Sequence, residues 1–565
     1  MNNEEKYMLA MYDVRGIQKY IFRTPDLKSA IGASSLVEGI IENALQEAIN
    51  HYNDDQYNND YYNNGHYNNG HHNEEAQAAL KTELQWFDDK KGPCSYQKDA
   101  FDVQILYIGG GNAYVVFRGE ELALDINKRM SRYVLEKTYS LQLAIAMIEK
   151  TESYKSDLEN IRKEMEKVKQ AMSFTMPLGA IPIVQTDSMT GYPLIKYEDD
   201  GGKQYSTEAL LKKKAAEKKR KNYSKEEKII DSLRTKKGVD SNIAVVHIDG
   251  NNLGLRIREL MYKKESYADG VTAQRKLSYQ IDHSYKTTFF KMKEHVEEFG
   301  KNNPVMKKLK PDDYYVIPVV VAGDDITYVC NARVALESVK YFAREISKCG
   351  MVDKTEKANV QKHYAFSICA GIAYANSHFP FHIAYDVAEK CCHNAKRTAK
   401  EAQHLQDGDI GNWLDFHICR NIQARNLSAV RAREYVTSAG EQLLTRPYFI
   451  ASGDEREGTV LGELAKETTP CSLSFLENAM KYFNDIECIP RSFSKRLEDA
   501  YSIGEKEVKE LGIFLESRGH KMPDGKHEYY YMKNSSYTAK WFDALEIMDF
   551  YLDGEGAEND EASEI

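Results

Sequence analysis

The feature that constrains this chain most is an internal duplication of one order of strands and helices. Two regions show the order strand, helix, strand, tight turn, strand, helix, strand, which is the ferredoxin-like βαββαβ arrangement. In the first region the strands are YMLAMYDVRGIQ, the hairpin QILYIGGGNAYVVF and LQLAIAMI, with a helix over residues 34–49. In the second region they are IAVVHIDGNNLG, the hairpin VIPVVVAGDDITYV and FSICAGIAYA. The duplication predicts an α+β fold with two tandem ferredoxin-like (βαββαβ) domains.

The two hairpin turns differ in the residues that carry chemistry. The first turn reads GGGN at 109–112, and the second reads AGDD at 322–325. Glycine and aspartate are also ordinary hairpin residues, so the second turn alone does not decide a function. In a βαββαβ fold the first and third strands are neighbours, and the hairpin starts beside the end of the first strand. We therefore expect Asp249 to lie close to Asp324 and Asp325.

Three converging carboxylates repel one another and are costly to keep ionised unless a cation offsets their charge. Oxygen ligands of this hard type suit magnesium or manganese, which bind through a few carboxylates and the phosphates of a nucleotide. The pattern predicts a phosphoryl-transfer site with two Mg²⁺ or Mn²⁺ ions. We expect the catalytic and metal-binding carboxylates to be Asp249, Asp324 and Asp325, with Ile248 as a further metal ligand.

Glycines at such a site let the backbone approach a nucleotide closely and offer its amides to phosphate. The expected nucleotide-binding residues of this kind are Gly250, Asn251 and Gly323 in the second copy and Gly110, Gly111 and Asn112 in the first. A helix over residues 384–401 provides candidate cations for the outer phosphates, namely Lys396, Arg397 and Lys400. The alternative for each is a surface cation on an amphipathic helix.

Three motifs in order resemble a known family. HIDGNNLG, AGDD and AEKCCHNAK together resemble the palm of nucleotide cyclases and polymerases of the GGDD and GGDEF kind. AEKCCHNAK is similar to the ADKALYxAK helix of diguanylate cyclases, which implies that Lys396 is the phosphate-binding lysine. DVRGIQKYIF followed by GGGN is similar to the first palm of the large polymerase-like subunit of type III CRISPR effector complexes. The resemblance covers about residues 7–150 and 240–420, and it implies synthesis of cyclic oligoadenylates from ATP held between two palms.

Four features depart from that subunit. The chain contains no HD dipeptide, and no CxxC pair lies between residues 150 and 240, so a nuclease motif and a zinc ribbon are not expected. Ala322 replaces the first glycine of GGDD. The first palm begins close to the start of the sequence, which leaves no room for a large amino-terminal module. These departures favour a self-standing signalling cyclase outside a complete effector complex.

Charge and composition narrow the class of protein. The 76 basic and 86 acidic residues give a net charge of −10, which argues against a surface coated with basic groups but allows a local basic groove. The polar start MNNEEK and the lack of a long apolar run predict a cytoplasmic protein without a membrane segment. Nine cysteines without a CxxC pair predict neither a disulfide framework nor a zinc site.

Changes in composition along the chain suggest its domains. We expect a non-catalytic first palm (1–150) with a disordered Asn/Tyr/His-rich insertion (51–73), a helical and loop linker (151–240), a catalytic second palm (241–420), a helical carboxy-terminal domain (421–552) and a disordered acidic tail (553–565). In the linker we expect helices with solvated faces over 149–170 and 212–237. The RPY motif at 446–448 is expected to be structural.

The sequence therefore favours a nucleotidyltransferase that joins ribonucleoside triphosphates, ATP first among them, into a cyclic di- or oligonucleotide messenger in antiviral defence. A non-catalytic palm scaffold that binds RNA or protein and a template-directed polymerase are the alternatives. The carboxylate trio argues against the scaffold, and the acidic net charge argues against the polymerase. An activating RNA, a partner subunit, a homo-oligomer, the base and the ring size are left open.

Overall fold

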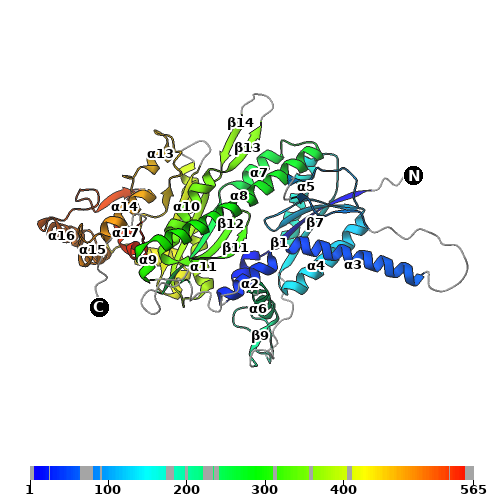
Figure 1. Cartoon of the computed structure of the whole chain (residues 1–565), viewed down its shortest axis with the longest axis horizontal. Coiled ribbons are helices and arrows are strands. Elements are labelled where there is room, and N and C mark those ends of the chain that lie inside the picture. The colour runs from blue at the N-terminus through cyan, green and yellow to red at the C-terminus, as the bar shows by residue number, and fades with distance from the viewer. Residues whose placement is uncertain are drawn as a thin grey trace, which may run out of the picture. The chain divides into compact units, whose positions relative to one another are not determined.

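The computed structural model describes residues 6–24, 26–63, 80–88, 92–172, 183–196, 202–220, 233, 241–309, 315–354, 361–403, 410–533 and 535–553. The chain divides into two compact units, which are Met1–Glu226 with Asn252–His283, and Glu227–Asn251 with Ser284–Ile565. Figure 1 shows their elements in chain order. Helices and strands are mixed in both units, so the predicted mixed α and β class is confirmed. The domain boundaries predicted from the sequence stay predictions.

The first unit is built on a five-stranded sheet in the order β2-β5-β6-β1-β7. Its strands are β1 (Tyr7–Arg15), β2 (Thr82–Glu83), β5 (Val103–Gly109), β6 (Asn112–Arg118) and β7 (Gln142–Glu149), and a small separate pair is β3 (Phe87–Asp88) and β4 (Gly92–Pro93). Strand β1 pairs antiparallel with both β6 and β7, so the first and third long strands are neighbours as expected. Runs of buried apolar residues on β1 and β6, such as Leu9, Ala10 and Val115, form the core.

The helices of the amino-terminal region differ in part from the expected ones. They are α1 (Ile17–Phe22), α2 (Leu27–Val37), α3 (Ile40–Asn63) and α4 (Glu120–Thr138). The single helix expected over 34–49 is interrupted at Gly39, whose φ of 64° lies in the left-handed region. Beyond it, α3 packs beside α4 (Figure 1) and continues to Asn63.

The prediction of disorder over 51–73 is wrong for residues 51–63. The apolar face of α3, which includes Ile41 and Leu45, is buried, and helix propagation from such a nucleus adds one hydrogen bond per residue. An ion pair of 2.7 Å between Asp55 and Arg129 of α4 further holds the polar part of the helix. Residues 64–73 of the insertion lie outside the described residues.

The region between the two predicted palms contains α5 (Tyr154–Ala171), the hairpin β8 (Leu194–Lys196) with β9 (Gln204–Ser206), and α6 (Thr207–Arg220). Helix α5 covers most of the segment predicted at 149–170, and α6 covers only residues 212–220 of the segment predicted at 212–237; neither helix is simply a solvated face. In α5 the side chains of Tyr154, Leu158 and Ile161 are buried. In α6 the ammonium group of Lys212 is buried and donates to Glu208 and to the Tyr20 carbonyl, each at 2.7 Å. Residues 221–232 and 234–237 lie outside the described residues.

The second unit is built on a six-stranded sheet in the order β11-β12-β10-β15-β16-β17. Its strands are β10 (Asn242–Gly250), β11 (Val316–Ala322), β12 (Asp325–Asn331), β15 (Ile368–Asn376), β16 (Asn412–Cys419) and β17 (Tyr448–Ile450). Strand β10 lies between β12 and β15, again with the first and third strands of the duplicated order as neighbours. The hairpin β13 (Gly350–Lys354) and β14 (Gln361–Ala365) projects from this unit (Figure 1).

Helices connect the strands of the second copy and make up most of the carboxy-terminal region. After β10 come α7 (Leu253–Met261), α8 (Tyr267–Asn302) and α9 (Pro304–Leu309), and after β12 come η3 (Ala332–Val334), α10 (Ala335–Ser347) and α11 (Phe381–Gln403). The remainder contains η4 (Ile422–Arg425), α12 (Leu427–Glu434), α13 (Val460–Ala465), α14 (Leu473–Asn484), α15 (Arg491–Ile503), α16 (Glu505–Ser517), α17 (Phe542–Ile547) and η5 (Met548–Phe550), with one hairpin, β18 (Tyr530–Lys533) and β19 (Ser536–Ala539). The helical character predicted after residue 421 is therefore present. Residues 554–565 of the predicted tail lie outside the described residues.

A buried arginine ties this helical region to the sheet. The guanidinium of Arg446 donates to Asp543 at 3.0 Å, to the Phe416 carbonyl at 2.6 Å and to Glu546. Arg446, Asp543 and Glu546 are all buried, and buried charges are stable only when they are paired with opposite charges. The structural role expected for the RPY motif agrees with this position.

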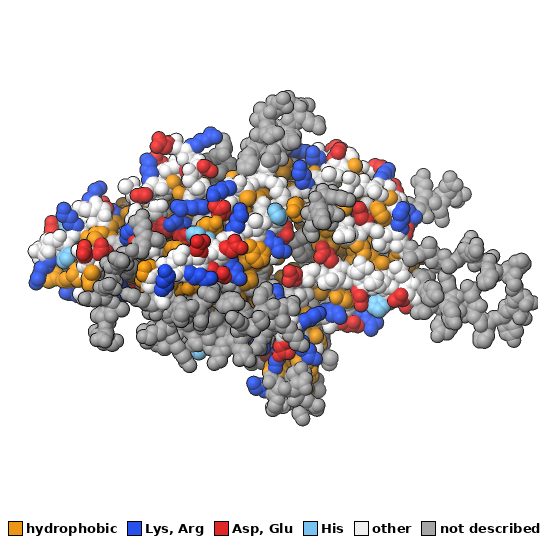
Figure 2. Space-filling model, in the orientation of Figure 1, with side chains coloured by type: hydrophobic (Ala, Val, Ile, Leu, Met, Phe, Trp, Pro, Cys, Tyr) orange, Lys and Arg blue, Asp and Glu red, His pale blue; other side chains and the backbone are white. Residues whose placement is uncertain are grey.

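The surface is mixed in charge. On the face in Figure 2, basic and acidic side chains are interspersed on the described surface rather than separated by sign. Within the part of the chain that the structure describes, none of the helices combines the length and the apolar character that a membrane crossing requires.

Candidate active site

The three predicted carboxylates meet at one edge of the second sheet. Asp249, near the end of β10, is the register partner of Asp325, the first residue of β12. Asp324 lies in the turn before β12, next to Gly323, whose φ of 59° lies in the left-handed region. The strand order therefore brings together the acids that the sequence predicted to converge.

The electrostatics of this edge are unfavourable for three free anions. Desolvation, followed by the negative charge of Asp249, raises the pKa of Asp324 to about 6. Asp325 adds to the same effect, whereas Lys396 opposes it. The edge is therefore short of positive charge when it holds only protein groups.

Lys396 of α11 reaches the same edge. Its ammonium group forms an ion pair with Asp249 Oδ2 and lies 3.3 Å from the Gly250 carbonyl oxygen. Burial lowers the pKa of Lys396, but the Asp249 carboxylate outweighs that effect and the net shift is upward. The lysine is thus a full positive charge placed against one of the three acids.

Close packing of α11 on the sheet positions this lysine. A side chain at Gly371 of β15 would place its Cβ 1.9 Å from the Ala388 carbonyl oxygen, so only glycine fits there. One turn further along α11, Cys392 Sγ donates to the Cys369 carbonyl at 3.2 Å. The helix therefore lies on the strand that pairs with β10, and its later residues arrive beside Asp249.

The chain leaves β10 through a bend held by Asn251. Its backbone N–H donates to the Ser367 carbonyl at 2.9 Å, and its side-chain amide donates to the Gly411 carbonyl at 3.1 Å. Ile248, predicted as a metal ligand, has a fully buried side chain, so only its main chain could serve a ligand. The roles predicted for Ile248, Gly250 and Asn251 stay predictions.

Sequence reasoning missed three polar side chains near the carboxylates. His247 is buried, with Nδ1 3.0 Å from Thr327 Oγ1 and 3.7 Å from Asp325 Oδ1. Burial lowers its pKa, so the imidazole is neutral at pH 7. Burial, together with the charges of Asp324 and Asp249, raises the pKa of Tyr285, whose hydroxyl lies 3.5 Å from the Ser367 carbonyl.

Glu389 is the third missed side chain. Burial raises its pKa, and the charge of Asp325 contributes in the same direction while His247 opposes it. Its position could have been found from helical spacing, because residues seven apart share a helix face and Lys396 is seven residues further on. Likewise, His247 shares a strand face with Asp249, two residues away.

The first unit contains a related arrangement. Asp13 of β1 is the register partner of Asn112, the first residue of β6, as Asp249 is of Asp325. Lys169 of α5 forms an ion pair with Asp13. Counting from Tyr154 and Phe381, Lys169 and Lys396 are each the sixteenth residue of the helix that follows the last strand of the duplicated order.

The predicted residues of the first copy lie at this edge. Gly110 and Gly111 form the turn with positive φ, and Asn112 follows it. No carboxylate stands in this turn, so the first copy has one acid and one lysine where the second has three acids and one lysine. Gly110, Gly111 and Asn112 belong to the first unit, and the Asp249 edge belongs to the second.

Buried contacts connect α11 to β16 and to α12. Asp415 of β16 accepts from Asn394 of α11 at 2.7 Å and from Arg431 of α12 at 2.7 and 2.9 Å. Arg431 also donates to the Phe416 carbonyl, which Arg446 shares. The helix that carries Lys396 is thus anchored two residues before the lysine.

The fit to a metal ion is chemical rather than geometric. Among the described residues, no group of three or more His, Cys, Asp or Glu side chains is arranged to hold a metal. The donors at the edge are nevertheless hard carboxylate oxygens with excess negative charge, which the raised pKa of Asp324 reflects. Donors of this type suit Mg²⁺ or Mn²⁺.

Comparison with known proteins gives a family for the second copy. Residues 242–404 match the family model of the second palm domain of Cas10/Cmr2. This segment begins with β10 and ends just after α11, so it contains Asp249, Asp324, Asp325 and Lys396. The resemblance to the large subunit of type III CRISPR complexes is confirmed by this match. No curated protein matches the chain.

Similar solved structures are Csm1 chains. The chain is 12% identical to one from a Csm1–Csm4 cassette in complex with pppApApA, with a TM-score of 0.42, covering 97% of this chain and 69% of that chain. The cassette in complex with cA4 is 12% identical with a TM-score of 0.39, covering 70% of this chain and 53% of that chain. Csm1 in T.onnurineus is 13% identical with a TM-score of 0.35, covering 70% of this chain and 52% of that chain. The chain spans about half the length of the last two. The similarity to the Cas10/Cmr2 second palm domain covers residues 242–404.

Proposed function

We propose that this chain, whose residues 242–404 are similar to the Cas10/Cmr2 second palm domain, is a nucleotidyltransferase that joins ribonucleoside triphosphates into a cyclic di- or oligonucleotide. The observation that carries this proposal is the meeting of Asp249, Asp324 and Asp325 beside Lys396 at one sheet edge. We interpret both units as tandem ferredoxin-like palms. The strand orders β7-β1-β6-β5 and β15-β10-β12-β11 support this interpretation.

The carboxylates are the proposed metal-binding groups. Asp249, Asp324, Asp325 and the main chain of Ile248 would hold one or two Mg²⁺ or Mn²⁺ ions. Bound there, such ions would neutralise phosphate charge and lower the pKa of an attacking hydroxyl.

Lys396 and Gly323 are the proposed nucleotide-binding groups, and His247 has a supporting role. Lys396 binds the outer phosphates as a point charge, and to do so it exchanges its contact with Asp249 for one with the triphosphate. Gly323 has open space where a Cβ would be, so the backbone of the turn allows close approach of a phosphate. His247, neutral and buried, holds the β12 end in place through Thr327.

The reaction is a substitution at phosphorus. A ribose hydroxyl oxygen forms a bond to the α-phosphorus of a second triphosphate, the bond to the β-phosphate oxygen breaks, and pyrophosphate leaves. The hydroxyl proton passes to solvent, so the charges balance. Repetition and a final intramolecular step close the ring.

The experiment is incubation of the purified chain with all four ribonucleoside triphosphates and Mg²⁺ or Mn²⁺, with products identified by mass spectrometry. ATP is the first substrate to test, since the similar structures include one Csm1–Csm4 cassette in complex with one ATP and one in complex with cA4. A variant with Asp324→Ala and Asp325→Ala is the control. A cyclic product that the variant does not make supports the proposal.

Two outcomes would count against it. A linear product that needs an added primer would indicate a template-directed polymerase. A non-catalytic scaffold would be indicated by two results together. The chain shows no turnover, and its affinity for nucleotide is the same with and without divalent cations and the same in the wild type and the variant. Repeating the assay with added RNA or a partner subunit separates a missing activator from a scaffold.

A further inference from the structure

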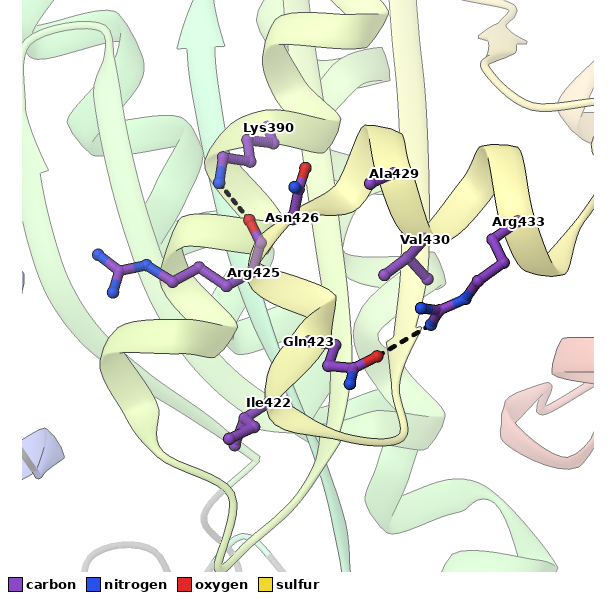
Figure 3. A pocket seen from close by; sticks show the side chains of 8 residues that line it. All are labelled: Lys390, Ile422, Gln423, Arg425, Asn426, Ala429, Val430 and Arg433. Atoms are coloured by element: carbon purple, nitrogen blue, oxygen red, sulfur yellow. Dashed lines mark hydrogen bonds between the residues drawn. The ribbon is translucent and has the colours of Figure 1, made fainter.

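A second feature of the Cas10/Cmr2-like unit is a surface hollow of about 600 Å³ (Figure 3). It lies between α11, η4 and α12 and is lined by Lys390, Ile422, Gln423, Arg425, Asn426, Ala429, Val430 and Arg433. Three of the lining side chains are cationic and none is a carboxylate. In Figure 3, Lys390 and Arg425 lie on one side and Arg433 on the other.

The hollow is separate from the carboxylate edge. Asp249 pairs with Cys369 near the start of β15, and β16 runs parallel to β15 from that end. η4 follows the opposite end of β16, where Cys419 pairs with Ala375. Six residue steps separate the two register pairs, which corresponds to about 20 Å along the sheet. On α11, Lys390 of the hollow lies six residues before Lys396, about 9 Å along the helix axis and on a different face of the helix.

The cations are held only weakly by protein partners. The Arg425 side chain is 64% exposed and donates to Asp386 at 2.9 Å, and the Arg433 side chain is 60% exposed and donates to Gln423 at 2.9 Å and to Glu434. Lys390 donates to the Arg425 carbonyl. Exposed ion pairs of this kind contribute little, so an anion with several oxygens can replace them.

The rest of the lining suits a nucleotide rather than a bare ion. Asn426 precedes α12 and makes no side-chain capping bond, so the first-turn N–H groups of that helix lack a side-chain acceptor there. The amides of Gln423 and Asn426 can donate and accept hydrogen bonds. Ile422, which is 65% exposed, and the side chains of Ala429 and Val430 provide apolar surface for a base or ribose.

We propose that this hollow binds the phosphate of a nucleotide, either free or as part of a short oligonucleotide. The cations bind the phosphate, and the apolar side chains contact the sugar and base. The volume lies within the range of small-molecule sites. This proposal goes beyond the nucleotidyltransferase reaction, and its test measures binding without turnover.

The test uses the full chain with Asp324→Ala and Asp325→Ala in EDTA, so that the carboxylate edge contributes little binding. The probe is a fluorescein-labelled single-stranded oligoadenylate RNA, followed by anisotropy. Adding Arg425→Ala and Arg433→Ala is expected to weaken binding about tenfold or more. The dependence on salt should also become shallower, because fewer cations contact phosphate.

A matched control removes two exposed cations elsewhere. Arg132 and Lys167 have side chains 80% and 72% exposed and each forms a surface ion pair, so Arg132→Ala with Lys167→Ala is expected to leave the affinity unchanged. Competition by AMP would indicate a free nucleotide as the source of the phosphate, and competition only by unlabelled RNA would indicate a strand. Equal weakening in the control, no weakening in the test variant, or no binding up to about 1 mM ligand would overturn the proposal.

Discussion

The ammonium group of Lys396 lies against the carboxylate of Asp249. A cation suited to phosphate is therefore partly neutralised by an acid suited to metal. Binding of a metal nucleotide would satisfy both groups at once, because Asp249 would hold the metal and Lys396 would hold the triphosphate. While no nucleotide is bound, the ion pair thus offsets one of the three negative charges at the edge.

Removing this lysine is expected to affect nucleotide binding more than stability. Lys396→Met should raise the KM for the triphosphate about ten- to hundredfold, the usual range for a lost charged hydrogen bond. The melting temperature should change little, because both side chains of the pair are partly exposed, at 26% and 34%. Steady-state pyrophosphate release and thermal unfolding measure the two quantities.

Arg397→Met is the matched control. Arg397 is the next residue on α11 and donates to Asn394 at 2.6 Å on the exposed side of the helix. Its KM should stay within about twofold of the wild type. A comparable rise in both variants would show that the helix contributes only a general positive potential.

Lys169 forms an ion pair with Asp13 in the first unit, as Lys396 does with Asp249 in the second. If the first copy seats a second nucleotide with Gly110, Gly111 and Asn112, Lys169→Met should reduce the number of bound nucleotides per chain by one. Isothermal titration with a non-hydrolysable ATP analogue measures this stoichiometry. An unchanged stoichiometry and affinity would assign Lys169 a purely structural role.

The raised pKa of Asp324 has a consequence for stability. The folded protein takes up a proton near pH 6, above the ordinary value of 3.8, so the folded state binds more protons than the unfolded state between these values. The charged carboxylate therefore destabilises the fold above pH 6, and this cost disappears as the pH falls toward 4.

Asp324→Asn should consequently be the more stable protein at pH 7.5 in EDTA. The gain is up to about 1 kcal/mol, after allowance for the partial exposure of this side chain. Thermal unfolding at pH 7.5 and pH 4.5 should show a difference that shrinks at the lower pH. A constant difference would contradict the assignment. Mg²⁺ should stabilise the wild type more than the variant.

The contact at Gly371 predicts a specific packing defect. In Gly371→Ala the new Cβ would meet the Ala388 carbonyl, so α11 must move away from β15, which costs about 1–3 kcal/mol. Because Lys396 is on this helix, the KM for nucleotide should rise as well. Urea unfolding and pyrophosphate release measure these effects.

Gly254→Ala is the control for this substitution. Gly254 is also in regular structure, in α7, but no atom lies within 4 Å of its added Cβ. Alanine should therefore stabilise the helix by about 0.5–1 kcal/mol. Destabilisation by both substitutions would indicate that steric contact with α11 is not the cause.

Local patterns in the sequence were enough to predict the elements of the site. Apolar β-branched runs predicted β10 and β12, the glycines predicted the turns, and the repeat predicted which strands are neighbours. These features depend on residues close together in the chain, where backbone sterics and hydrogen bonding decide the conformation. The convergence of Asp249 with Asp325 followed from them.

Contacts between distant residues were decided only by the tertiary structure. Lys212, in a lysine-rich segment typical of solvated helices, is buried because Glu208 and the Tyr20 carbonyl satisfy its charge. The continuation of α3 through polar residues depends on its packing beside α4. Periodicity describes one element at a time and cannot show what packs against it.

The site divides in the same way. The sequence by itself determined the three acids, the lysine helix and the turn glycines, because each is a local pattern with its own chemistry. Only the tertiary structure decided that Lys396 pairs with Asp249, that His247 and Glu389 lie near Asp325, and that three cations from α11, η4 and α12 surround one hollow. These relationships join residues tens to more than a hundred positions apart. The pairing of β10 with β12 creates the contact of His247 with Asp325, and the packing of α11 creates the others.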